Sequence, residues 1–226
     1  MNMSTRIKLK AEDGHEAGAY VAESTGPARG AIIVIQEIFG VNSHIRSVAD
    51  DYASQGFHSI APALFDRVQR DVELHYNPQD TAQGMKIARQ IGLETALKDV
   101  AAAMSFSRRQ WSALKVGVVG YCYGGSLAWL AATRLDPTAA VGYYGGQIAQ
   151  NAAEVPRCPV MLHFGAKDPH IGPAEIEKIR HAHPDLPLFL YDAGHGFNCD
   201  QRKDYDPASA KLARQRTLEF FGTHLQ

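Results

Sequence analysis

The stretch Val116–Ser126, VGVVGYCYGGS, decides the fold of this chain. It starts as a β-branched run that is apolar on both faces, which predicts a strand buried in the middle of a sheet. It then passes through a glycine-framed turn, with Cys122 at its apex, into a small-residue segment that predicts a helix over 126–134. Gly120 and Gly124 flank the cysteine two residues away, where side chains would obstruct the turn. The sequence therefore predicts a sharp strand-to-helix turn that presents a cysteine.

The position of Cys122 indicates a nucleophile. The turn places its side chain at a helix N-terminus, where backbone N–H groups and the helix dipole favour a negative charge. A thiol there should ionise more readily than a free one. The alternative is a tight turn around a buried structural cysteine. The preceding strand, the following helix and the extra Gly125 together favour the nucleophile.

Working outward, strand patterns alternate with helix patterns along the chain. This alternation predicts an α/β fold, a mostly parallel sheet with helices on both faces. No repeat, linker or low-complexity tract interrupts it, so we expect a single domain over 1–226. The segment 65–84 has no clear period and is expected to be a long loop or a short-helix insertion. The patterns predict strands at 31–35, 57–61, 115–120, 139–144, 159–165 and 186–191, and helices at 43–55, 93–109, 126–134 and 207–225.

Length and composition exclude several classes of protein. The chain has 226 residues and a formal net charge of −1, so no basic excess points to nucleic acid. No apolar run approaches the roughly 20 residues needed to cross a bilayer. Its three cysteines, an odd count, suit a reducing compartment better than a disulfide framework. We expect a cytoplasmic protein without membrane or nucleic-acid partners, present as a monomer or weak homodimer.

A base and an orienting acid follow Cys122 in the chain. Asp168 comes just after the predicted strand 159–165, and His195 comes just after the predicted strand 186–191. Ligand sites in open α/β sheets lie at the carboxyl ends of strands, so all three side chains are expected at one edge. Taken singly, Asp168 could be a turn or cap residue and His195 a loop histidine. Their order, nucleophile then acid then histidine, is that of the α/β-hydrolase fold.

A zinc site is a competing interpretation of the same loop. His195 and Cys199 are four residues apart, and Asp200 follows. Zinc sites usually combine paired Cys or His motifs, and the chain has neither C-x-x-C nor H-E-x-x-H. We therefore expect no metal and no cofactor.

Three segments resemble the dienelactone hydrolase (carboxymethylenebutenolidase) family: QEIFGVN at 36–42, GYCYGG at 120–125 and VGYYG at 141–145. The resemblance extends from about Gly30 to Phe221 and implies an α/β-hydrolase fold. It implies that Cys122 is the nucleophile, His195 the base and Asp168 its partner.

The resemblance also gives roles to the loop at 36–42. It implies that Glu37 contacts the resting thiol and takes part in activating it when substrate binds. A partly dry carboxylate near a thiol could accept its proton. Backbone N–H groups of Ile38 and Tyr123 would form the oxyanion hole, and the elbow rule independently predicts the donor from Tyr123.

Dienelactone-cleaving members of the family hold the substrate carboxylate with two arginines. PALFDR at 62–67 matches the segment of the first, which implies that Arg67 binds substrate. The second is expected four residues after the histidine, where this chain has Cys199, with Arg202 further on. This departure leaves the choice among dienelactone, another lactone, an ester and a thioester open.

The expected function is hydrolysis of a small ester or lactone, including carboxylate-bearing ones, through an acyl-thioester on Cys122. A carboxylesterase or thioesterase with a different substrate is an alternative within the enzymes. Outside them, the chain could be a noncatalytic α/β-hydrolase scaffold. It could also be a thiol redox sensor with Cys199 as the resolving thiol.

Overall fold

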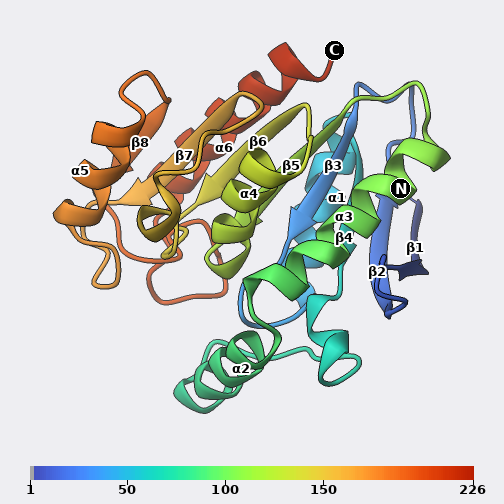
Figure 1. Ribbon diagram of the computed structural model, residues 1–226, viewed down its shortest axis with the longest axis horizontal. Helices are drawn as coiled ribbons and strands as arrows, with labels where there is room; N and C mark the ends of the chain where they lie inside the picture. Colours follow the sequence, from blue (N-terminus) through green and yellow to red (C-terminus); the bar gives the residue numbers. More distant parts are fainter. Residues whose placement is uncertain (1–2) are drawn as a thin grey trace.

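The computed structural model describes residues 3–226 and contains an eight-stranded sheet at its centre (Figure 1). The strand order is β1-β2-β4-β3-β5-β6-β7-β8. β3 to β8 run parallel, as the alternation of strands and helices predicts, while β1 and β2 add an antiparallel edge. The strands are β1 Met3–Lys10, β2 Glu16–Glu23, β3 Ala31–Ile35, β4 His58–Pro62, β5 Val116–Tyr121, β6 Ala139–Tyr143, β7 Val160–Gly165 and β8 Leu188–Tyr191.

Helices cover both faces of the sheet. In Figure 1, α3 and α4 lie in front of the strands, and α1 and α6 lie behind them. β3, β5, β6 and β7 between these layers are buried along their whole length. The expectation of an α/β-hydrolase fold is therefore confirmed. The helices are α1 Ser43–Ser54, α2 Pro78–Ile91, α3 Leu93–Gln110, α4 Tyr123–Arg134, α5 Pro173–Ala182 and α6 Pro207–His224, with short 3-10 turns η1 Leu64–Arg67 and η2 Ala149–Asn151.

Several sequence expectations need correction. The sequence patterns missed β1 and β2, which precede the first expected strand. β1 is mostly exposed, and β2 alternates between buried and partly exposed residues, so neither forms a continuous apolar run. The sequence patterns also did not predict helix α5. The segment 65–84, expected as a long loop or a short-helix insertion, contains most of η1 and the first half of α2, so the long-loop alternative is wrong and the helical one is closer. Asn77 caps this helix by accepting a hydrogen bond from the Asp80 N–H, and Pro78 occupies its first turn.

The segment from η1 to α2 packs against the loop that follows β3. A Cβ atom on Gly84 of α2 would lie 1.9 Å from the Ile38 carbonyl oxygen. A Cβ on Gly40 would lie 1.8 Å from the Val72 carbonyl oxygen. At both places a backbone carbonyl lies against the glycine, so the segment 65–84 packs closely against the loop 36–42.

Within residues 3–226, no helix is both long and apolar enough to span a membrane.

Candidate active site

Cys122 sits on a strained turn between β5 and α4. Its backbone has φ 54° and ψ −112°, a conformation that side-chain-bearing residues rarely adopt. The flanking glycines are required, because a Cβ on Gly120 would lie 1.8 Å from the Gly124 carbonyl oxygen. A Cβ on Gly124 would in turn lie 2.3 Å from the carbonyl oxygen of Ile35. α4 begins at Tyr123, three residues earlier than expected, so the half-buried thiol lies directly at the helix N-terminus.

The structure brings His195 and Asp168 to this thiol in a line. The distance from His195 Nε2 to Cys122 Sγ is 3.1 Å. On its other side His195 Nδ1 donates a hydrogen bond of 2.6 Å to Asp168 Oδ2. Asp168 follows β7 and His195 follows β8, so both side chains reach the site from the carboxyl ends of parallel strands. The imidazole is oriented by the acid and aimed at the sulfur.

The contacts among these side chains shift the pKa values of His195 and Asp168. Burial opposes the charged imidazolium, but the neighbouring Cys122 thiolate and the Asp168 hydrogen bond raise the pKa of His195 to about 10. Burial acts to raise the pKa of Asp168, and the hydrogen bond from His195 outweighs it and lowers that pKa below its usual range. The contacts of His195 with the sulfur and with the carboxylate therefore favour a charged imidazolium at this position.

Glu37 lies in the loop after β3 and is completely buried. Its Oε1 accepts a hydrogen bond of 3.1 Å from Arg202 Nη1, while Oε2 has no hydrogen-bond partner among the described residues. No described contact joins this carboxylate to Cys122. The contact that the family resemblance implies between Glu37 and the resting thiol is therefore not seen. Glu37 forms an ion pair with Arg202 instead.

Arg202 reaches Glu37 from the loop between β8 and α6. A Cβ on Gly196, which has φ 76°, would lie 2.7 Å from the Arg202 guanidinium, so this glycine makes room for it. The guanidinium also lies 5.8 Å from the ring centroids of Phe39 and Tyr76, within cation–π range. Arg202 stands seven residues after His195 in the sequence, where a fixed four-residue spacing does not find it.

The two predicted oxyanion-hole donors follow β3 and β5, which are neighbouring parallel strands. Tyr123 is the first residue of α4, and its N–H therefore has no partner within the helix. Ile38 directly follows Glu37, and neither of the two N–H groups donates to an acceptor among the described residues. Both groups remain available to a ligand, and their role in catalysis stays a prediction.

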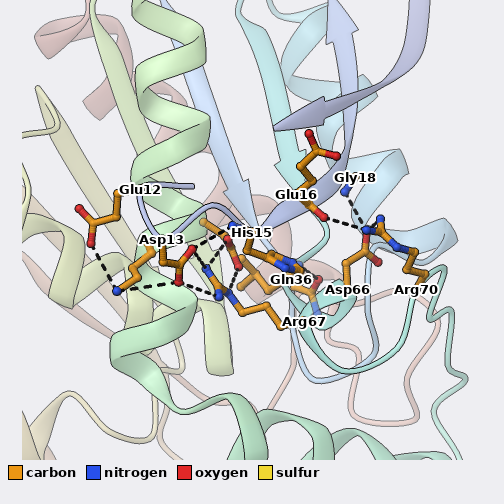
Figure 2. A network of polar contacts seen from close by, with 12 residues as sticks. Glu12, Asp13, His15, Glu16, Gly18, Gln36, Asp66, Arg67 and Arg70 are labelled. Atoms are coloured by element: carbon orange, nitrogen blue, oxygen red, sulfur yellow. Dashed lines mark hydrogen bonds and ion pairs between the residues drawn. The ribbon is translucent and has the colours of Figure 1, made fainter. Parts of the chain in front are cut away.

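Arg67 forms ion pairs with two acids, Asp13 and Asp99, and Figure 2 shows it beside Asp13. Its Nε donates to Asp99 Oδ2 at 2.6 Å, and its Nη1 donates to Asp13 Oδ2 at 2.9 Å. Asp99 is almost fully buried, so the arginine is its principal charge partner. No described contact joins Arg67 to Cys122, Asp168 or His195. Binding a substrate carboxylate would require this arginine to leave two acids.

Cys199 occupies the position expected for a second substrate arginine and is fully buried. Burial and the nearby Glu37 carboxylate raise the pKa of its thiol to about 12, which makes it a poor resolving thiol for a redox switch. Two neighbours of this cysteine, His44 in α1 and Tyr76 before α2, carried no signal in the sequence, because their approach depends on how three loops fold together.

The parallel sheet, with the cysteine elbow after β5 and the acid and histidine after β7 and β8, defines an α/β-hydrolase. The chain belongs to the dienelactone hydrolase family, whose model matches residues 17–225. It is therefore a hydrolase that acts on ester bonds.

Similar proteins agree with this assignment. The chain is 31% identical to carboxymethylenebutenolidase 1 of Cupriavidus pinatubonensis, over 96% of each chain. It is 34% identical to the carboxymethylenebutenolidase of Pseudomonas putida, over 95% of this chain and 94% of the other. A crystal structure from Klebsiella pneumoniae, of a protein proposed to be a dienelactone hydrolase, superposes with a TM-score of 0.85 at 29% identity and covers 98% of both chains.

Proposed function

We propose that this protein cleaves a small ester or lactone through an acyl-thioester on Cys122. The observation that carries the proposal is the line of contacts from Cys122 Sγ through His195 to Asp168, at 3.1 Å and 2.6 Å. Each member has the chemistry that its place requires: a nucleophilic sulfur, a proton carrier and an acid that fixes the tautomer of the imidazole.

In the first step the Cys122 thiolate attacks the substrate carbonyl and forms the carbon–sulfur bond. The carbonyl oxygen gains negative charge, which the N–H groups of Ile38 and Tyr123 would stabilise. Collapse of the intermediate breaks the carbon–oxygen bond, and the His195 imidazolium gives its proton to the departing alkoxide. In a lactone the alkoxide stays tethered to the acyl group, so ring opening leaves both ends in the site.

In the second step water attacks the thioester and gives a proton to His195. The carbon–sulfur bond then breaks, which releases the acid and restores the Cys122 thiolate. Acylation removes the negative charge of the sulfur, which is one of the interactions that raise the pKa of His195 to about 10 in the resting protein. The pKa of the histidine should therefore fall once the thioester has formed. The same residue then changes from acid to base without moving.

The relatives' name, carboxymethylenebutenolidase, describes a lactone with a carboxylate-bearing side group. A carboxylate-bearing lactone is accordingly the first substrate to test. Arg202 is the cation best placed to attract it, because its guanidinium lies in the site and has a side chain that is 17% exposed. Its partner Glu37 would then be released from part of its ion pair and become able to accept a proton.

The test is hydrolysis of dienelactone and p-nitrophenyl acetate by the wild type, Cys122→Ala and the matched control Cys158→Ala. We expect Cys122→Ala to lose at least about 10³-fold in kcat/KM. Cys158→Ala should keep it, since Cys158 precedes β7 and so lies at the end of the sheet opposite to the site. Mass spectrometry after rapid quenching should find the acyl group on Cys122. Near-wild-type turnover by Cys122→Ala would overturn the proposal.

A further inference from the structure

Beside the proposed active site, three ligand-type side chains from separate elements converge. Glu37 comes from the loop after β3, His44 from the first turn of α1, and Cys199 from the loop before α6. One ligand atom of each lies within 4.8 Å of the others, and all three residues are buried. The chain separation between the first two and Cys199 makes this a product of the tertiary structure. The zinc interpretation of His195, Cys199 and Asp200 concerned a different set.

Two of these side chains have a buried polar atom without a partner. Neither Glu37 Oε2 nor His44 Nε2 has a hydrogen bond within the described part of the chain. An unpartnered buried carboxylate oxygen or imidazole nitrogen is costly, so native proteins usually satisfy it. A cation bound between the side chains would satisfy both atoms with one ligand.

Two of the three side chains are positioned by hydrogen bonds to neighbours outside the cluster, as is common for metal ligands. His44 Nδ1 donates to Asp200 Oδ1 at 3.1 Å, which leaves Nε2 as the ring nitrogen available to a metal. Metal-binding histidines commonly donate their second ring N–H to a carboxylate in this way. Arg202 holds Glu37 through Oε1 alone, which fixes the carboxylate and leaves Oε2 for another partner. Asp200 is 64% exposed, so the cluster lies one side chain below the surface.

We propose that Glu37, His44 and Cys199 bind a zinc-type divalent cation through one oxygen, one nitrogen and one sulfur. Zinc takes this donor set at bond lengths of about 2.0–2.3 Å, so the three side chains must close slightly around the ion. Cys199 releases its proton to solvent and binds as a thiolate. The carboxylate and the thiolate balance the charge of the ion.

Binding at this site would hold Glu37 Oε2 on the ion, so this carboxylate could no longer accept a proton from the thiol. Zinc would then inhibit hydrolysis, a consequence that rests on the proposed function of the Cys122 site. The binding itself does not rest on it. The experiment is therefore one of binding, in a protein that cannot catalyse the reaction or offer Cys122 as a ligand.

The starting protein is Cys122→Ala, titrated with Co²⁺ as a spectroscopic substitute and with Zn²⁺ against a chromophoric chelator. We expect one ion per chain and a near-ultraviolet sulfur-to-cobalt charge-transfer band. Adding Cys199→Ala should remove the band, whereas adding Cys158→Ala should leave it. Asp200→Asn, a surface change that keeps all three ligands, should weaken zinc binding about 10–100-fold and thereby test the site without disturbing the core.

Two results would overturn the site. One is the absence of saturable zinc or cobalt binding at micromolar metal in the folded Cys122→Ala protein. The other is a charge-transfer band that survives Cys199→Ala. Neither result bears on whether Cys122 is the nucleophile, which the hydrolysis and mass spectrometry experiment decides.

Discussion

Arg202 Nη1 lies 3.1 Å from Glu37 Oε1, although 165 residues separate the two in the chain. Both side chains are largely buried, with exposed fractions of 17% for Arg202 and 1% for Glu37. The pair ties the loop after β3 to the loop after β8, on either side of the cysteine elbow. The charge of Arg202 is thus the main compensation for a carboxylate that has no access to water.

Removing the arginine should therefore destabilise the protein strongly. We expect Arg202→Met to lower the free energy of unfolding by about 3–5 kcal/mol, because it leaves the Glu37 charge buried without a partner. Adding Glu37→Gln should recover part of the loss by removing the charge. Urea denaturation of both single variants and the double variant measures the coupling. Additive losses would contradict a direct interaction.

Gly84→Ala tests the close approach of α2 to the loop at Ile38. Helix propensity alone predicts that alanine stabilises a helix interior by about 1 kcal/mol over glycine. The structure predicts the opposite sign, since the new Cβ would lie 1.9 Å from the Ile38 carbonyl oxygen. The expected result is a lower melting temperature and slower hydrolysis. Gly146→Ala, at an exposed position with nothing within 4 Å of the new Cβ, is the matched control and should change neither.

Arg67→Met separates a structural role from substrate binding. Asp99 would lose its principal charge partner, so we expect a loss of about 3–5 kcal/mol in the free energy of unfolding. Asp99→Asn in the same chain should restore part of it. The ratio of kcat/KM for an anionic lactone to that for a neutral ester should stay unchanged in the double variant. A selective loss for the anionic substrate would instead support the substrate role that the family resemblance implies.

The histidine of the site should titrate far above its ordinary range. NMR titration of the imidazole should give a pKa of about 10 for His195 in the wild type and a lower value in Cys122→Ala, where the thiolate is absent. Because the folded protein holds this proton more tightly, the resulting stabilisation is fully present below pH 6.5 and is lost as the pH rises to about 10. His163 is an internal control, since burial lowers its pKa to about 3 and keeps it neutral. An unchanged His195 pKa in Cys122→Ala would contradict the proposed ion pair.

Local sequence was sufficient for the central features of this protein. The apolar run before Cys122 and the glycines around it specify a buried strand and a sharp turn, because backbone sterics act over a few residues. The order of Cys122, Asp168 and His195 could be predicted for a related reason. In a parallel sheet, residues that follow successive strands arrive at the same edge.

Side-chain pairing across the fold was decided by the tertiary structure alone. The sequence around Arg67 and Arg202 does not distinguish an arginine free for substrate from one held by a buried acid. That difference depends on Asp99, Asp13 and Glu37, which are distant in the chain and reach the arginines only after the sheet has formed. The cluster of Glu37, His44 and Cys199 is of the same kind, since long-range contacts between loops have no local periodicity to reveal them.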